Sequence, residues 1–208
     1  MPSPSEPSHY FDPAPEVGSR RRSIELALPE GRLVQLTTDR GVFSADHVDP
    51  GTRLLLATAP PLDDARTLVD VGCGYGPLAI AMALRAGEGA TVWAVDVNER
   101  ARALCAENAE INGVADRVRV VAPDEVPDDL VVDTVWSNPP IRIGKAALHE
   151  LLAGWFARLA PDGTAVLVVQ RNLGADSLAR WIEQGGRPVE RLASRAGFRI
   201  LSVAGVRS

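Results

Sequence analysis

The chain has 208 residues, 46% hydrophobic and 24% charged, which suits one globular domain with a short extension and excludes disorder along its whole length. A net charge of −5 argues against attraction of the whole surface to nucleic acid, so any RNA contact must come from a local basic patch. No apolar stretch is long enough to span a membrane, and two cysteines are too few for a disulfide framework or a zinc site. The N-terminus lacks the pattern of a signal peptide, so we expect a cytoplasmic protein without membrane or metal partners.

The first part of the chain predicts an extension that packs on the main domain. Its predicted elements are an irregular, proline-rich arm over residues 1–19, the strands Ser23–Leu28 and Arg32–Thr38, and the helix Arg53–Ala59. Pro29-Glu30-Gly31 joins the two alternating strands and predicts a β-hairpin, and Asp49-Pro50-Gly51-Thr52 opens the helix. We expect residues 1–60 to pack on a core formed by residues 61–208 as one compact unit.

From Arg66 onward, predicted strands alternate with predicted helices. The strands are the apolar runs Thr67–Val71, Thr91–Val95, Arg117–Val121, Leu130–Trp136 and Thr164–Val169. The helices are Leu78–Ala86, Asn98–Asn112, Ala146–Leu159 and Ala175–Glu183. Two last strands, Pro188–Ser194 and Phe198–Ala204, predict an antiparallel C-terminal hairpin. This alternation predicts an α/β fold with a doubly wound, mostly parallel sheet covered on both faces.

Polar clusters follow three of the predicted strands. Open α/β sheets bind ligands at the carboxyl ends of their strands, so we expect the three clusters to converge in space. The first cluster, the glycine-rich loop Asp70–Gly76, precedes a helix whose first N–H groups lack partners. A dinucleotide fingerprint would need a third glycine where Pro77 stands, so the spacing disfavours a nicotinamide-dependent oxidoreductase. The second, Asp96, follows the loop at about the 20-residue separation expected of a carboxylate that binds ribose hydroxyls.

The third cluster is Ser137-Asn138-Pro139-Pro140. Two consecutive prolines fix the backbone and remove two N–H donors, which leaves only acceptors. These acceptors are the side-chain oxygen of Asn138 and the carbonyl oxygens of Asn138 and Pro139. Such a set can hold a neutral, planar –NH2 group by its two hydrogens.

The segments DVGCGYGP, VDVNERARALCAENAEINGV and SNPPIRIGK resemble class I S-adenosylmethionine (SAM) dependent methyltransferases. More narrowly, the chain is similar to the "methyltransferase small" domain of ribosomal RNA guanine-N2 methyltransferases over about residues 9–204. The resemblance implies a Rossmann-like sheet of seven strands, SAM as the cofactor and S-adenosylhomocysteine as the product.

The resemblance also implies roles for individual positions. Residues Asp70, Gly72, Cys73, Gly74 and Gly76 of the loop would hold the methionine part of SAM. Asp96 would bind the ribose, Val97 would pack on the adenine, and Asp124 would face the adenine amino group. The catalytic positions would be Asn138, Pro139 and Pro140, which hold the target amine.

Substrate contacts are expected from the residues that follow this motif. Ile141 stands where many relatives carry an aromatic residue that stacks on the base, so we expect the stacking to be weaker or to come from elsewhere, with Phe43 and Tyr10 as candidates. Arg142 and Lys145 are candidate phosphate contacts, and so is the basic run at residues 20–22.

The leading interpretation is therefore an N-methyltransferase that acts on an exocyclic amino group, with guanine N2 of ribosomal RNA as the leading substrate. Two alternatives remain open. One is SAM-dependent methylation of a protein amide or a small-molecule amine, which the acidic charge favours. The other is a SAM-binding module without catalysis. A basic patch beside the pocket would favour RNA, and we expect a monomer or a weak homodimer.

Overall fold

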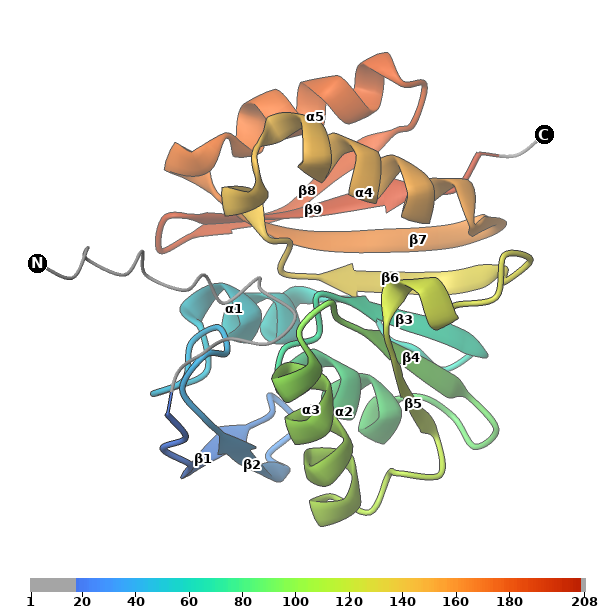
Figure 1. The fold of residues 1–208 in the computed structure, drawn as a ribbon. Coiled ribbons are helices and arrows are strands. Elements are labelled where there is room, and N and C mark those ends of the chain that lie inside the picture. The colour runs from blue at the N-terminus through green and yellow to red at the C-terminus, as the bar shows by residue number, and fades with distance from the viewer. Residues whose placement is uncertain (1–17, 207–208) are drawn as a thin grey trace, which may run out of the picture.

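The computed structural model describes residues 18–206, and its main feature is a seven-stranded sheet of order β5-β4-β3-β6-β7-β9-β8 (Figure 1). The strands are β3 (Thr67–Val71), β4 (Thr91–Val95), β5 (Val118–Val121), β6 (Val132–Ser137), β7 (Leu159–Gln170), β8 (Val189–Arg195) and β9 (Phe198–Ala204). All neighbours from β5 to β7 pair in parallel, whereas β9 runs antiparallel to both β7 and β8. This confirms the predicted doubly wound sheet with an antiparallel C-terminal hairpin.

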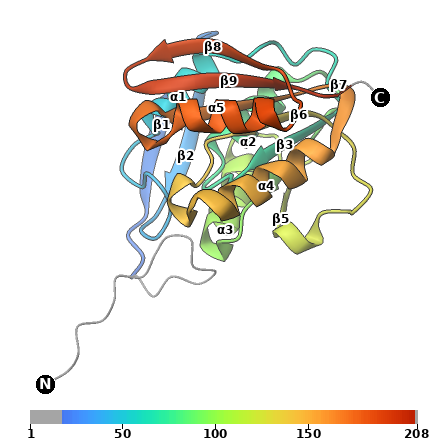
Figure 2. The ribbon, with the colours of Figure 1, turned by 90° about the horizontal axis from the view of Figure 1, so that it is seen from above.

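Helices cover both faces of the sheet (Figures 1 and 2). They are α1 (Pro50–Thr58), α2 (Pro77–Arg85), α3 (Glu99–Ile111), α4 (Lys145–Ala157) and α5 (Ala175–Gln184). Successive side chains of a strand point to opposite faces, so each strand serves two cores. Val166 and Val168 of β7 belong to the core that contains α1, α2 and α3 residues, whereas Leu167 and Val169 belong to the core with α4 and α5 residues.

The predicted N-terminal hairpin is confirmed as a separate two-stranded sheet of β1 (Arg22–Ala27) and β2 (Leu33–Thr38). Two asparagine side chains of α3 attach this hairpin to the domain. They form hydrogen bonds with the backbone of β2 in the way that a neighbouring strand would. The Asn108 side chain accepts from Thr37 N (2.6 Å) and donates to Thr37 O (2.8 Å). Asn112 does the same with Gln35. The chain leaving β2 is thereby directed across the carboxyl edge of the main sheet toward α1.

Two predicted boundaries differ from the structure by three or more residues. The helix expected from Arg53 begins at Pro50, because the Asp49 carboxylate accepts from Thr52 N (3.1 Å) and caps it. Strand β7 begins at Leu159 and not at the predicted Thr164, because Leu159 already pairs with Val132.

Three short 3₁₀ segments follow strands at the carboxyl edge: η1 (Pro123–Glu125), η2 (Ile141–Ile143) and η3 (Arg171–Leu173). Among residues 18–206, no helix is both long and apolar enough to cross a membrane. The same part of the chain holds no group of three or more His, Cys, Asp or Glu residues that could ligate a metal.

Candidate active site

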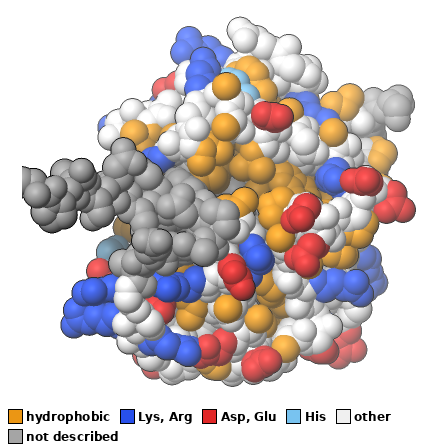
Figure 3. All heavy atoms as spheres, viewed as in Figure 1, with side chains coloured by type: hydrophobic (Ala, Val, Ile, Leu, Met, Phe, Trp, Pro, Cys, Tyr) orange, Lys and Arg blue, Asp and Glu red, His pale blue; other side chains and the backbone are white. Residues whose placement is uncertain are grey.

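A pocket lies over the carboxyl ends of β3, β4 and β6. All three predicted polar clusters contribute to its lining, through the loop after β3, Asp96 and Asn138. Leu151 and Trp155 of α4 line it too. Figure 3 shows hydrophobic side chains gathered around a hollow between α4 and α3. The pocket therefore combines apolar walls with a few polar groups, as small-molecule sites commonly do.

The glycine-rich loop is fixed to the end of β4 by backbone hydrogen bonds. Gly72 N (2.9 Å) and Cys73 N (3.1 Å) both donate to Val95 O. Gly76 lies behind the loop and not on the pocket wall, where it precedes α2 with φ of 93°. A Cβ atom there would lie 2.7 Å from the Cys105 sulfur, so both conformation and space require glycine.

Asp70 is fully buried and lines the pocket. Its Oδ2 accepts from Ala79 N (2.9 Å) in the first turn of α2, while its Oδ1 has no hydrogen-bond partner. Burial raises the pKa of this carboxyl to about 8; the Ala79 bond opposes the shift and the charge of Asp96 adds to it. A buried, unpartnered carboxyl oxygen fits a cationic group such as the ammonium of a methionine moiety.

Asp96 ends β4 with its carboxylate held by two backbone donors. Gly74 N donates to Oδ2 (2.8 Å) and Asn98 N donates to Oδ1 (2.9 Å). Burial raises the pKa of Asp96, although both bonds and the charge of Arg102 oppose the shift. Each carboxylate oxygen can accept a further bond, so the group can hold the two hydroxyls of a ribose.

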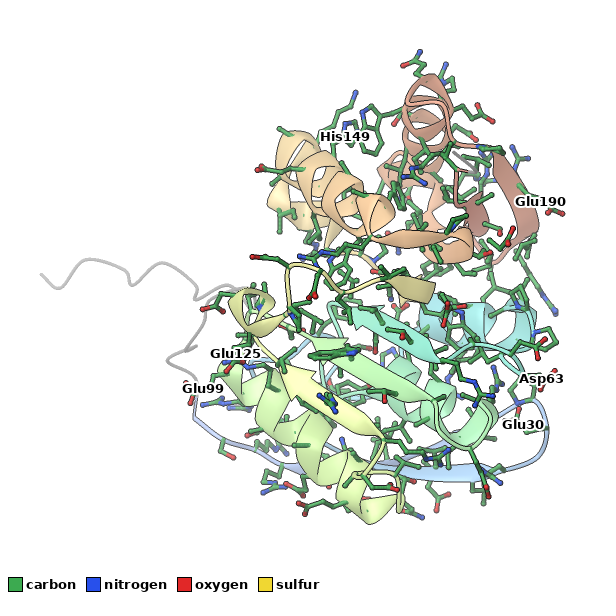
Figure 4. All side chains as sticks on the ribbon, turned by 90° about the vertical axis from the view of Figure 1, so that its right-hand side faces the viewer. Glu30, Asp63, Glu99, Glu125, His149 and Glu190 are labelled. Carbon is green, nitrogen blue, oxygen red and sulfur yellow. The ribbon has the colours of Figure 1, made fainter. Side chains whose placement is uncertain are left out.

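Beyond Asp96 the pocket is lined by apolar residues, although the sequence also predicted an acid there. Val97 and Pro123 line the pocket, and Val97 is 47% exposed. Asp124 is exposed in η1 and does not line the pocket. Figure 4 shows Glu125 of η1 on the same side of the molecule as Glu99, which begins α3.

The Asn138 side chain is held in one orientation. Its Nδ2 donates to Asp49 Oδ2 (2.9 Å) and Thr52 Oγ1 (3.1 Å). A carboxylate only accepts, so the amide nitrogen must face Asp49 and the amide oxygen is left to accept from another group. Sequence reasoning missed Asp49 and Thr52 because it treated them only as the start of a helix. Their N-cap pattern was visible, but their contact with Asn138, 86 or more positions away, depends on the fold.

The two prolines shape the turn after Asn138. Pro140 has φ −73° and ψ 75°, and Ile141 N donates to Pro139 O (2.8 Å), which together form an inverse γ-turn. Pro140 lines the pocket, whereas Pro139 is buried and does not. The Pro139 carbonyl accepts from this backbone N–H, and Pro139 does not line the pocket, so its expected role in holding the amine stays a prediction. The Ile141 side chain packs against the core that contains α4 residues and does not line the pocket.

The remaining predicted substrate contacts lie in different places. Phe43, 42% exposed, lines the pocket from the loop between β2 and α1, and Tyr10 lies outside the described residues. Arg142 in η2 and Lys145 at the start of α4 are exposed and do not line the pocket. Trp155, which was not among the predicted site residues, forms part of the pocket wall.

A family model described as "Methyltransferase small domain" matches residues 33–202. YbxB of Bacillus subtilis, described as an uncharacterized protein, is 32% identical over 93% of this chain and 96% of its own length. Ribosomal RNA small subunit methyltransferase C of Hahella chejuensis is 34% identical over 86% of this chain and 52% of its own.

Among solved structures, the T. thermophilus 16S rRNA N2 G1207 methyltransferase (RsmC), in complex with AdoMet and guanosine, matches with a TM-score of 0.75 and 25% identity. The match covers 93% of this chain and 52% of that one. The chain therefore spans nearly all of the Bacillus relative but about half the length of the two ribosomal RNA methyltransferases.

Proposed function

Because the chain belongs to the methyltransferase small domain family and is a SAM-dependent methyltransferase, we propose that it methylates the exocyclic N2 amine of a guanine in ribosomal RNA. The observation that carries the choice of an amine is the fixed orientation of Asn138. Its amide oxygen lies next to two prolines without N–H groups, so it can accept from –NH2. It offers no hydrogen-bond donor to a deprotonated hydroxyl or a carboxylate.

Different residues of the pocket fit different parts of the cofactor. SAM, when bound, supplies a methyl group on a sulfonium sulfur, and the rest of the molecule leaves as a neutral thioether. Asp70 fits its ammonium, Asp96 fits its ribose, and Val97 and Pro123 fit the faces of its adenine. Cys73 and Gly74 of the loop, whose backbone lines the same pocket, fit the methionine chain.

Asn138 Oδ1 directs the lone pair of the target nitrogen by accepting one of its hydrogens. It also stabilises the positive charge that develops as the N–C bond forms and the C–S bond breaks. The methylated nitrogen then loses a proton to water, so no protein base has to act before transfer. Correct alignment of two reactants can lower a barrier by up to about 7–11 kcal/mol in favourable systems.

A basic hollow beside the pocket favours RNA over a small molecule. Arg20, Arg22 and Arg40 line it together with Asp46, which pairs with Arg22. The buried Asp39 carboxylate holds two of these arginines side by side, because it accepts from the backbone N–H groups of Arg20 and Arg40. Figure 3 shows basic side chains gathered over β1 and α3 on this side. Arginines grouped in this way suit phosphodiester contacts.

The test is transfer of labelled methyl from SAM to ribosomal subunits, transfer RNA and cell protein in separate reactions. We expect label in ribosomal RNA, recovered as N2-methylguanosine after digestion to nucleosides. Label in protein, in another nucleoside or in none of the fractions would overturn the proposal.

The basic hollow can be tested by measuring RNA affinity at several salt concentrations. The pair Arg20→Gln and Arg40→Gln should reduce the slope of log affinity for RNA against log salt by about 2 and leave SAM binding unchanged. The matched pair Arg180→Gln and Arg191→Gln, both exposed on α5 and β8, should leave the slope as it is. Equal slopes for the two pairs would remove the hollow from the RNA site.

A further inference from the structure

We propose that Asp49 selects the target base, by accepting a hydrogen bond from the ring N–H beside the amine that is methylated. This inference rests on the proposed function, because it names the base edge that the same pocket reads.

The Asp49 carboxylate has a fixed position and one oxygen available at the pocket. Asp49 is half-buried and lines the pocket. Its Oδ2 accepts from Thr52 N (3.1 Å) and from Asn138 Nδ2 (2.9 Å). Its Oδ1 makes no hydrogen bond to any of residues 18–206.

The space beside the Asp49 carboxylate requires glycine at position 51. A Cβ atom on Gly51 would lie 2.8 Å from Asp49 Oδ2 and 2.8 Å from a ring carbon of Phe198. Only glycine leaves the space that the carboxylate occupies. Gly51, two residues after the N-cap Asp49, therefore leaves room for the carboxylate to lie against Asn138.

Asn138 and Asp49 consequently present two neighbouring acceptors. The bond between Asn138 Nδ2 and Asp49 Oδ2 joins the amide and the carboxylate side by side, with the Oδ1 atom of each left to accept. A ligand that satisfies both must carry an –NH2 group next to an N–H group.

Guanine has this pair of donors, because its N1–H lies beside its 2-amino group. Adenine and cytosine carry a ring nitrogen lone pair beside their amino group, and a glutamine side chain carries a carbonyl there. Each of these places an acceptor against the Asp49 carboxylate, which leaves two acceptors facing each other without a hydrogen. Sites built to pair a donor discriminate strongly against analogues that lack it.

The test compares two nucleosides that share the 2-amino group and differ at N1. Guanosine has N1–H, and 2-aminopurine riboside has a lone pair at N1. Binding is measured by NMR titration to the full chain saturated with S-adenosylhomocysteine. We expect the wild-type protein to bind guanosine at least tenfold more tightly than 2-aminopurine riboside.

Asp49→Asn isolates the donor–acceptor pattern at nearly constant shape. The new amide oxygen can still accept from Asn138, while its –NH2 can donate to the N1 lone pair of 2-aminopurine riboside. The preference for guanosine should fall to threefold or less. Thr52→Val is the matched control: it removes the other partner of Asn138, so it should weaken both nucleosides alike and keep the ratio.

An unchanged ratio in Asp49→Asn, or equal binding of both nucleosides by the wild-type protein, would overturn the role of Asp49. Affinity for S-adenosylhomocysteine serves as the check that each variant is folded. The labelling experiment remains a separate test of the proposed function: N2-methylguanosine in RNA combined with an unchanged ratio would reject only this inference.

Discussion

SAM binding should release almost one proton at pH 7, and Asp70 is the group that releases it. In the unliganded protein its buried carboxyl has a pKa raised to about 8. About nine-tenths of the molecules therefore hold Asp70 in its neutral form at pH 7, and about one-tenth at pH 9. An ammonium group beside the unpartnered Oδ1 favours the ionised form, so the proton leaves as the cofactor enters.

Calorimetric titration with SAM in two buffers of different ionisation enthalpy measures this proton. We expect release of about 0.9 proton per bound SAM at pH 7 and about 0.1 at pH 9. Asp70→Asn serves as the control, because its amide can still accept from Ala79 N but has no proton to lose. Release below about 0.3 proton at pH 7, or equal release by the variant, would show that Asp70 is already ionised or does not meet the ammonium.

Three further results follow from the same geometry. Asn138→Ala should lower kcat at least tenfold with SAM affinity nearly unchanged; a smaller loss in single-turnover transfer would contradict its role. Gly76→Ala should lower both Tm and SAM affinity because its Cβ meets Cys105, whereas Gly144→Ala, at φ of 95° but in open space, reports the cost of backbone strain alone. The unliganded protein should lose stability as the pH rises from about 4 to 8, because the raised pKa of Asp70 favours its protonated form in the folded state; denaturant titrations of Asp70→Asn should show a smaller loss.

Sequence reasoning located the parts of the site that depend on local pattern. Strands β3 and β4 have the predicted bounds because each is an apolar run that ends at a chain-bending or charged residue, Gly72 or Asp96. Parallel strands bring such endings to one edge, so the glycine-rich loop, Asp96 and Asn138 were expected to converge, and they line one pocket.

The parts that were missed depend on contacts between distant segments. Trp155 lies in an apolar helix, and nothing in its neighbours distinguishes a residue buried against the sheet from one that walls a pocket. Asp49 and Thr52 were predicted to begin a helix, but their partner Asn138 follows a strand 86 or more positions later in the sequence. The predicted boundary at residue 60 also divides residues that share this pocket, because Phe43 and Asp49 line it together with Asp70.

The two acids at the strand ends explain why a cation suits this pocket better than a neutral nucleoside. Burial raises the pKa of both Asp70 and Asp96, and the negative charge of Asp96 raises the pKa of Asp70 further. Arg102 offsets part of this, but its guanidinium bonds the backbone carbonyls of Asp96 and Val97 and leaves the carboxylates to other donors. A ligand that carries positive charge and hydroxyl donors supplies what both acids lack.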